Sequence, residues 1–238
     1  MSASPSTATA PNPLTPQLSI IMPALNEAAD IGAALQALAP LRARGAQVIV
    51  ADGGSSDDTA AVARACGVQV VQAPRGRALQ MNTGVRLATG DTLLFLHADT
   101  RLPDEADRLV AEALASAASW GRFDVYITGR SPALRVIAAC MNLRSRWSGI
   151  ATGDQAMFMT RAAFAAVGGF AEQPLMEDIE ISRRLRRLSG PACLRAKVLT
   201  SGRRWESRGV WRTVLLMWQL RYAYWRGAAP DRMAELYR

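Results

Sequence analysis

Four short runs of apolar residues, each followed by a helix-like pattern, occupy the first half of this 238-residue chain. The runs span 18–22, 47–51, 68–72 and 92–97. The helical patterns span 26–39, 59–66, 78–88 and 104–118; we expect Asn26 to cap the first and Pro103 to open the last. Strands that are apolar at every position are buried on both faces, which is typical of parallel sheets covered by helices. This pattern predicts an α/β fold with a mostly parallel sheet.

The second half of the chain mixes strands and helices in a less regular order. Residues 122–128 alternate in polarity, as expected for a strand with one polar face. The remaining patterns predict helices at 132–147, 161–167 and 178–188 and a strand at 156–160. No repeat or linker separates the halves, and a chain of this size buries about 70% of its surface on folding. We therefore expect a single domain whose second half extends the same sheet.

The ends of the chain and its cysteines suggest a cytoplasmic location. Residues 1–17 lack the basic and apolar regions of a secretory signal, and their Ser, Thr, Ala and Pro content predicts a disordered leader. No stretch is long and apolar enough for a transmembrane helix. The three cysteines have no paired spacing, which disfavours a disulfide framework or a thiolate zinc site and favours a reducing compartment.

The charge balance is basic and consists almost entirely of arginine. The chain has 28 Lys and Arg residues against 20 Asp and Glu, and Lys197 is the only lysine. Guanidinium groups suit phosphates, so an anionic ligand or an acidic membrane surface is a candidate partner. A GC-rich genome, which the abundant Ala, Gly and Pro indicate, is the other explanation. The arginines form no nucleic-acid readout motif, so we expect no nucleic-acid partner.

Three polar groups lie directly after predicted strands, at 23–27, 52–55 and 97–99. Ligands of open α/β sheets bind beyond the carboxyl ends of the strands, so these groups are candidate binding residues. Asp, Gly and Ser also favour ordinary turns, which is the alternative for each group taken alone. Neither a Walker lysine motif nor GxGxxG is present, which disfavours the common phosphate-loop and dinucleotide sites.

Four segments that include these groups resemble, in order and spacing, the inverting glycosyltransferases of family 2. They are PALNEA (23–28), VIVADGGSSDDT (48–59), GRALQMNTG (76–84) and LLFLHADT (93–100). TGDQAMF (152–158) and LMEDIEISRRLRR (175–187) resemble the acceptor-side motifs of that family. GRFDV (121–125), MNLRSR (141–146) and SGRRWESRGVWRT (201–213) resemble a subgroup labelled radical-SAM/selenodomain-associated transferase 2, or arsenosugar-biosynthesis-type glycosyltransferase.

The resemblance implies the GT-A fold, a Rossmann-like, mostly parallel sheet flanked by helices in a single domain. On that basis residues 18–118 form the nucleotide-binding half, 119–205 the acceptor-binding half and 206–238 an amphipathic C-terminal helical segment. The implied reaction moves a sugar from a UDP-type nucleotide donor to a small acceptor, with inversion, by a metal-assisted single displacement. A sugar-1-phosphate nucleotidyltransferase is an alternative, although PALNEA stands where such enzymes carry a Gly-rich basic signature.

The same resemblance assigns the donor site. Asp52 is expected to accept a hydrogen bond from the base and Glu27 to contact the ribose, because carboxylates suit N–H and O–H donors. The residues implied in nucleotide binding are Pro23, Ala24, Asn26, Glu27, Asp52, Gly53, Arg77, Asn82 and Ala98. Asp99 matches the last aspartate of the family's DxD motif and would bind Mg²⁺ or Mn²⁺. His97 replaces the first aspartate, and it is a candidate metal ligand, phosphate contact or packed strand-end residue.

Glu177 and Asp178 match the family's ED motif, in which the aspartate is the expected base and the glutamate supports it. Capping of the following helix is the alternative role of Asp178. The expected acceptor and sugar pocket comprises Gly153, Asp154, Gln155, Arg203, Arg204 and Trp205. Ser201 stands where processive relatives carry the glutamine of QxxRW, which weakens any inference of polymer synthesis.

The segment 210–226 is aromatic, basic and amphipathic. Docking on a membrane surface is one interpretation. Packing on its own domain or on a twin subunit in a homodimer is the other. A basic membrane- or nucleic-acid-binding module without catalysis remains the non-enzymatic alternative for the whole chain.

Overall fold

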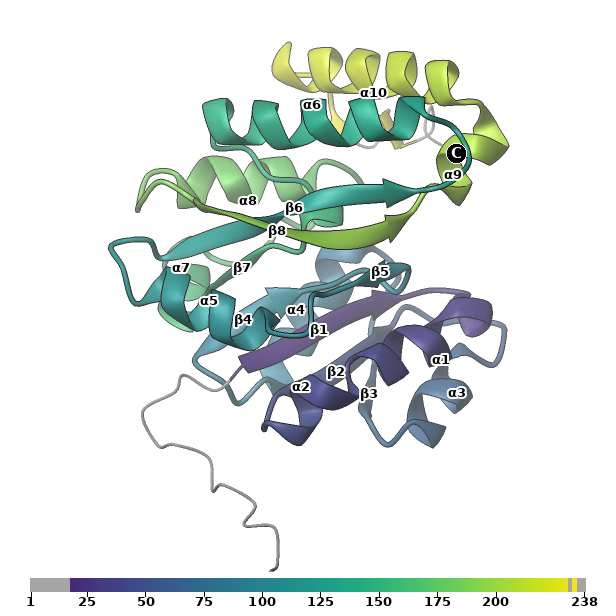
Figure 1. Cartoon of the computed structure of the whole chain (residues 1–238), viewed down its shortest axis with the longest axis vertical. Coiled ribbons are helices and arrows are strands. Elements are labelled where there is room, and N and C mark those ends of the chain that lie inside the picture. The colour runs from purple at the N-terminus through teal and green to yellow at the C-terminus, as the bar shows by residue number, and fades with distance from the viewer. Residues whose placement is uncertain (1–17, 231–232, 235–238) are drawn as a thin grey trace, which may run out of the picture.

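The computed structural model describes residues 18–230 and 233–234, whose strands form one sheet of eight in the order β3-β2-β1-β4-β7-β6-β8-β5. The strands are β1 (Leu18–Ala24), β2 (Gln47–Asp52), β3 (Gln69–Gln72), β4 (Thr92–Phe95), β5 (Thr100–Arg101), β6 (Trp120–Thr128), β7 (Phe158–Thr160) and β8 (Ala192–Ser201). In Figure 1 the first half of the chain lies at the bottom and the second half above it. The predicted leader at 1–17 lies outside the described residues.

Helices cover both faces of this sheet. They are α1 (Ala28–Ala37), α2 (Ala39–Ala43), α3 (Thr59–Ala65), α4 (Arg77–Leu87), α5 (Ala106–Leu114), α6 (Ala133–Ser148), α7 (Arg161–Ala166), α8 (Glu177–Leu185), α9 (Arg203–Arg208) and α10 (Val210–Trp225), with a short 3₁₀ turn η1 (Gly153–Gln155). Among the described residues, no helix combines the length and the apolar character that crossing a bilayer requires.

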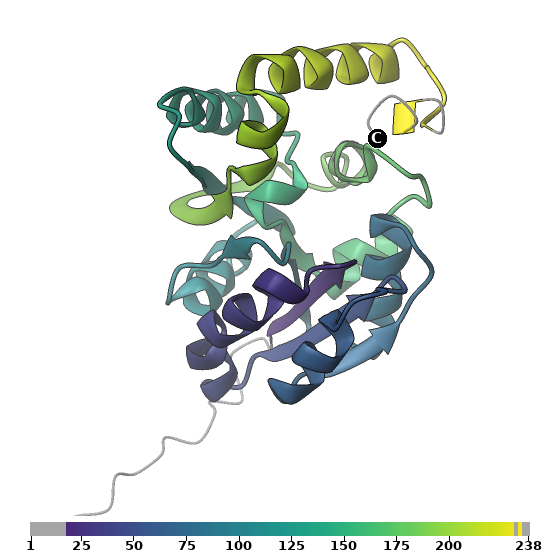
Figure 2. The ribbon, with the colours of Figure 1, turned by 90° about the vertical axis from the view of Figure 1, so that its right-hand side faces the viewer.

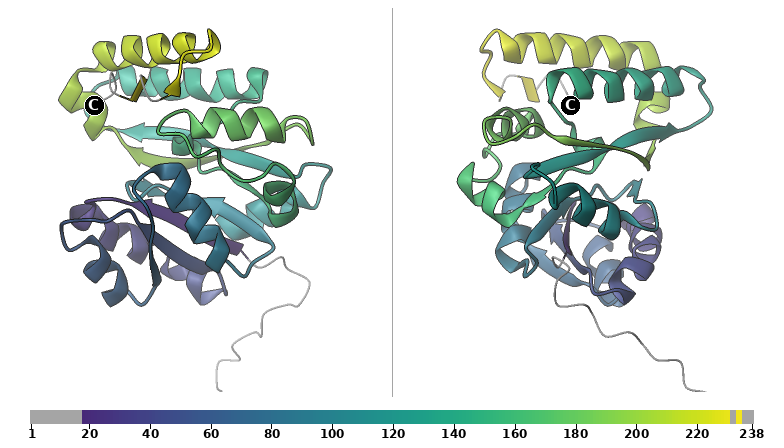
Figure 3. Two further views of the ribbon diagram at one scale, coloured as in Figure 1. Left: turned by 180° about the vertical axis from the view of Figure 1, so that it is seen from behind. Right: turned by 60° about the vertical axis from the view of Figure 1, so that its left-hand side comes forward.

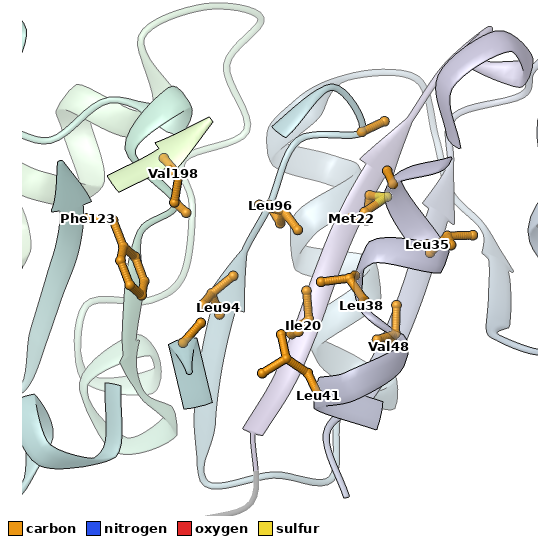
Figure 4. Packing of buried hydrophobic residues seen from close by; sticks show 14 of the residues in the cluster. Ile20, Met22, Leu35, Leu38, Leu41, Val48, Leu94, Leu96, Phe123 and Val198 are labelled. Carbon is orange, nitrogen blue, oxygen red and sulfur yellow. The ribbon is translucent and has the colours of Figure 1, made fainter. Parts of the chain in front are cut away.

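The predicted parallel unit is confirmed. β1 pairs in parallel with β2 on one side and with β4 on the other, and β2 pairs in parallel with β3. Ile20 and Met22 of β1 belong to one hydrophobic cluster, whereas Ile21 between them belongs to a second. Figure 4 shows the first cluster, in which Leu35 and Leu41 pack beside β1. Because both faces are covered, every residue of β1 is buried.

The second half continues the same sheet, as the sequence predicts. β7 pairs antiparallel with β4 and with β6, and β6 pairs in parallel with β8. β8 is not evident from the sequence, because the exposed Arg195 and Lys197 interrupt its apolar residues. A strand with one solvated face and charged residues on that face has no continuous apolar run to reveal it.

Two predicted helix starts are wrong. Asn26 does not cap α1: its φ of 56° is left-handed, α1 begins at Ala28, and the Asn26 side chain accepts a hydrogen bond from the Ser56 amide (2.9 Å). Pro103 precedes α5 rather than opening it, because α5 begins at Ala106. Contacts with a neighbouring loop, which local patterns do not encode, determine the first of these starts.

The C-terminal helix α10 packs on the body of its own chain. Leu220 joins Leu175 and Met176, directly before α8, in a third hydrophobic cluster. The Tyr224 hydroxyl donates a hydrogen bond to Glu180 of α8 (3.1 Å). Figures 1 and 3 show α6 and α10 together at the end of the molecule farthest from β1–β3, and Figure 2 shows α10 passing over α8.

Gly121 is the position where β6 joins both of its neighbours, since it pairs with Phe158 of β7 and Ala192 of β8. A Cβ there would lie 2.4 Å from the Ala192 carbonyl oxygen and 2.5 Å from the Phe158 ring.

We expect Gly121→Ala to lower the free energy of unfolding by about 1–3 kcal/mol, because the added methyl group overpacks the strand junction. Urea denaturation of the variant measures this change. Gly190→Ala is the matched control, since a Cβ at Gly190 meets nothing within 4 Å. Equal stability of the two variants would contradict the close approach of β6, β7 and β8.

Candidate active site

The loops after β1 and β2 lie side by side at one edge of the sheet. Gly53 donates a hydrogen bond from its amide to the Ala24 carbonyl (2.9 Å). The buried Gln80 of α4 donates from its amide nitrogen to the carbonyls of Ala24 (2.7 Å) and Ala51 (3.0 Å). Pro23, Ala24, Asp52 and Gly53 are all buried, so the described loops project from a rigid base.

Side chains of the two loops hold them in a fixed shape. The Asp52 carboxylate is buried and accepts hydrogen bonds from the amides of Gly54 (3.2 Å) and Ser55 (3.1 Å) and from the Ser55 hydroxyl. The Ser55 hydroxyl in turn accepts from the Asn26 amide (2.9 Å). The Glu27 amide donates to Thr59 (2.8 Å). A carboxylate has about four acceptor positions, so Asp52 can accept one more donor.

The end of β4 approaches the turn η1. His97 Nδ1 lies 3.4 Å from a carboxylate oxygen of Asp154, and the imidazole packs directly on Gly153. A Cβ at Gly153 would lie 2.6 Å from His97 Nε2, so only glycine allows this contact. The structure thus brings His97 to the residues predicted for the acceptor and sugar pocket.

Asp99 lies beside a hollow of about 330 Å³ between α1 and the strands β5 and β8. Asp30 and the buried Ala98 also line this hollow. Within residues 18–230 and 233–234, no three His, Cys, Asp or Glu side chains are arranged to hold a metal ion by themselves. Asp99 and Asp30 carry carboxylate oxygens, the ligand type that Mg²⁺ and Mn²⁺ prefer, and Asp30 is paired with Arg203.

The predicted acidic pair, Glu177 and Asp178, forms the first two residues of α8. Met176, directly before this helix, has a left-handed φ of 66°. Asp178 is half-buried, and its carboxylate accepts hydrogen bonds from the amides of Gly153 (3.0 Å) and Ile179 (2.8 Å). Glu177 is buried and lies 3.4 Å from Arg77 Nη1 of α4. The pair therefore joins η1, α4 and α8 at one point.

Burial raises the pKa of Glu177 above that of an ordinary glutamate, and the neighbouring Asp178 carboxylate raises it further. Arg77 and His97 oppose this shift without cancelling it. Two adjacent carboxyl groups thus differ in surroundings: Glu177 is enclosed, whereas Asp178 is partly accessible. A pair of carboxyl groups in which one is enclosed and the other is accessible is typical of acid–base sites.

Several predicted site residues have other contacts. Asn82, predicted to bind nucleotide, uses both ends of its amide on the Phe170 backbone (2.9 and 3.0 Å), so we assign it to holding that loop. Gln155 is fully buried and forms a capping box with Thr152. Trp205 packs against the first hydrophobic cluster, and Arg203 pairs with Asp30. The Arg204 side chain lies outside the described part of the structure.

Two arginines that the sequence analysis did not single out lie near the acidic pair. Arg144 of α6 interacts electrostatically with Asp178, and Arg221 of α10 with Asp178 and Asp154. The helical spacing of Arg221 is visible in the sequence. Arg221 lies four residues after Met217 and three before Tyr224, which both pack inward on α10, so it shares their face of the helix.

A larger hollow of about 480 Å³ lies at the opposite edge of the sheet, beside the first residue of β4 and the last of β7. Arg161, which lines this hollow, donates hydrogen bonds to the carbonyls of Ala88 and Gly90. The polar side chains described in the preceding paragraphs lie instead at the edge formed by the carboxyl ends of β1, β2 and β4, so we place the candidate site there.

Comparison with known proteins identifies the family of the chain. The sequence model described as Glycosyl transferase family 2 matches residues 19–171. The succinoglycan biosynthesis protein ExoA of Rhizobium meliloti (strain 1021) is 32% identical over 187 residues, covering 70% of this chain. The match spans 57% of that protein's length.

Solved structures share the fold at low identity. Glucosyl-3-phosphoglycerate synthase from Mycobacterium tuberculosis, crystallised with Mn²⁺, UDP and glucosyl-3-phosphoglycerate, has a TM-score of 0.58 and 19% identity, covering 78% of this chain and 71% of that one. Mannosyltransferase PcManGT from Pyrobaculum calidifontis, in complex with GDP-Man and Mn²⁺, has a TM-score of 0.60 and 22% identity, covering 91% and 64%.

The raised pKa of Glu177 predicts a pH-dependent stability. Ionising this carboxyl is harder in the folded protein than in the unfolded chain, so stability falls as the pH rises from the pKa of an ordinary glutamate through the raised value. Glu177→Gln removes the titration. We expect the Tm of the variant minus the Tm of the unmodified protein to increase as the pH rises above the ordinary pKa of a glutamate.

Calorimetry across this range measures the difference. Glu172→Gln is the control, because Glu172 is exposed in the loop before α8. A Tm difference for Glu177→Gln that does not change with pH would contradict the enclosed position of this carboxyl.

Proposed function

Because the chain belongs to glycosyl transferase family 2, we propose that it transfers a sugar from a UDP-type donor to a small acceptor, with inversion, in a single displacement. Its GT-A fold is shared with structures that bind nucleotide sugars or nucleotides. The observation that carries the proposal is the position of Asp178. Its carboxylate is held by the Gly153 amide beside the end of β4 and stays partly accessible.

The donor site would form on the loops after β1 and β2. Asp52 has acceptor capacity for one N–H of a base, and Glu27 lies on the adjoining loop, where a carboxylate suits ribose hydroxyls. Arg77 opens α4, and its guanidinium suits a diphosphate. The mannosyltransferase from Pyrobaculum calidifontis holds GDP-Man, so the fold alone does not choose the base.

A divalent cation fits the residues at the end of β4. Asp99, with Asp30 on the same hollow, offers hard oxygen ligands, and Mg²⁺ or Mn²⁺ commonly takes one or two carboxylates and completes its coordination with substrate phosphates and water. Asp99 would hold the ion, which would neutralise charge on the departing diphosphate. The contact of His97 with Asp154 and Gly153 favours a role in positioning η1.

Asp178 would act as the base. Its two backbone hydrogen bonds fix the direction of the carboxylate, which would accept the proton of the acceptor hydroxyl as that oxygen attacks the anomeric carbon. Glu177 would hold Arg77 at the same site. The acceptor itself is not specified by these contacts, and the arsenosugar subgroup stays a prediction from sequence resemblance.

We also propose that α10 docks on an anionic membrane surface. Five large side chains, here called the aromatic face, are 60–77% exposed along one side of this helix: Trp211, Leu215, Trp218, Tyr222 and Trp225. The helix has no acidic residue, and the exposed Arg212 and Arg226 flank the face. Aromatic rings with basic neighbours suit the interface of an anionic bilayer.

Asp178→Asn tests the proposed base. We expect sugar transfer to fall by about 10²–10⁴-fold, because the amide cannot take the proton, while UDP binding persists. UDP release from UDP-sugars with an acceptor panel measures turnover, NMR of the product gives the anomeric configuration, and thermal shift with and without Mn²⁺ measures binding. Glu112→Gln, exposed on α5, is the control. Full activity of Asp178→Asn, a retained configuration, or no response to any UDP, GDP or dTDP sugar would refute the proposal.

Trp211→Ser combined with Trp218→Ser tests the aromatic face. We expect binding to phosphatidylglycerol-containing vesicles to weaken by about tenfold or more, because two interfacial rings are lost. Co-sedimentation measures it, and Leu188→Ser, an exposed apolar residue after α8, is the control. The proposal would be wrong if the protein does not bind vesicles but forms a dimer that the tryptophan substitutions dissociate. That result would show that a second copy covers this face instead.

A further inference from the structure

Arg144 and Arg221 interact electrostatically with Asp178 from two different helices. Arg144 lies on α6 and Arg221 on α10, and Figure 2 shows α10 passing over α8, which carries Asp178. The two guanidinium groups interact with each other, and both interact with Asp178. Among the described residues, neither has a carboxylate within 4.0 Å, so they form no ion pair with Asp178 or Asp154 in this arrangement.

Arg144 is poorly compensated for its burial. Nε and Nη2 of Arg144 are fully buried and have no hydrogen-bond partner in the part of the chain that the structure describes. Burial, with repulsion from Arg221 and Arg122, lowers the pKa of Arg144 to about 10. Burial also lowers the pKa of Arg221, against the opposing effect of Asp178 and Asp154. An enclosed cation without a partner is costly.

The neighbouring Arg122 shows how this chain satisfies an arginine with a structural role. Arg122 is fully buried, pairs with Asp124, and donates to Ser145 (3.0 Å) and the Asn142 carbonyl (3.1 Å). Arg146, two residues after Arg144, pairs with the same Asp124 (2.8 Å). No equivalent carboxylate is provided for Arg144 or Arg221 within residues 18–230, which is the arrangement expected when a ligand supplies the anion.

We propose that Arg144 and Arg221 bind a phosphate or carboxylate group of the acceptor, whose hydroxyl then faces Asp178. This inference rests on the proposed function, and it identifies the acceptor class as a small hydroxylated anion. The donor diphosphate has a separate arginine in Arg77, which opens α4 on the side of the β1 and β2 loops. Two guanidinium groups suit an oxyanion because each offers paired N–H donors.

The test is calorimetric titration of the full chain with glycerol 3-phosphate, glycerate and glycerol, each at saturating UDP and without UDP. We expect the two anions to bind and glycerol not to bind. Comparing glycerol 3-phosphate with glycerate identifies whether phosphate or carboxylate is preferred. Arg144→Gln and Arg221→Gln should each weaken anion binding by about tenfold or more, while UDP affinity stays unchanged. Arg135→Gln on α6 and Arg212→Gln on α10, both exposed, should leave anion binding within about twofold.

A stability measurement separates ligand binding from a structural role. Arg144→Met should keep or raise the Tm, because replacing an unpaired buried cation with an apolar side chain removes its desolvation cost. Normal anion binding by Arg144→Gln and Arg221→Gln, equal binding of glycerol, or loss of UDP affinity in these variants would overturn the proposed anion subsite. So would the absence of anion binding in a protein that binds UDP, an outcome that leaves the donor site intact. Absence of UDP binding would instead refute the proposed function, and with it the acceptor role of the two arginines.

Discussion

Because β1, β2 and β4 run parallel and in register, their carboxyl ends reach the same edge of the sheet, and the candidate site depends on this alignment. The Gln80 amide stabilises this alignment by donating to the last residue of β1, Ala24, and to the next-to-last residue of β2, Ala51. The Ala24 carbonyl also accepts from the Gly53 amide, so Gln80 and Gly53 together hold the end of β1 against the loop after β2. These hydrogen bonds are buried, which makes them costly to lose. The same helix begins at Arg77, whose contact with Glu177 joins α8 to this edge.

The arginine excess has a structural use that composition alone does not reveal. Three arginines donate to the carbonyls that end helices belonging to other parts of the chain: Arg42 to Cys66 (2.9 Å), Arg161 to Ala88 (2.7 Å) and Arg184 to Val167 (2.6 Å). These carbonyls follow α3, α4 and α7, where a helix has unsatisfied acceptors and partial negative charge. Arg184 also has Nε and Nη2 without a hydrogen bond, but it donates to Val167 from Nη1 and lies 3.6 Å from Glu180. Arg144 differs because, among the described residues, it has neither a carbonyl nor a carboxylate partner.

The sequence predicts the parts of the structure that local patterns encode. Continuous apolar runs identified β1, β2 and β4, and their polar endings identified Asp52 and His97. Asp178 was identified by resemblance to a family motif, and its carboxylate accepts a hydrogen bond from Gly153, on which His97 packs. The pattern could not reveal β8, whose charged face hides its strand character, or the role of Asn82, which depends on Phe170, 88 residues away. Arg144 and Arg221 were missed for a related reason, because the helical spacing of Arg221 from Met217 and Tyr224 does not show what that face of the helix packs against. Their significance comes from the crossing of α6, α8 and α10, which no single segment contains.

The two faces of α10 connect the proposed membrane contact with the proposed acceptor subsite. The inward face carries Leu220, Arg221 and Tyr224, which fix the helix to α8 or face Asp178. The outward face carries the aromatic residues, which have no covering element among the described residues. Because a helix transmits displacement along its length as a rigid body, a surface that holds the aromatic face also sets the position of Arg221. An acceptor that carries an anionic group at such a surface would therefore meet Arg221 and Asp178 from the side where α10 lies.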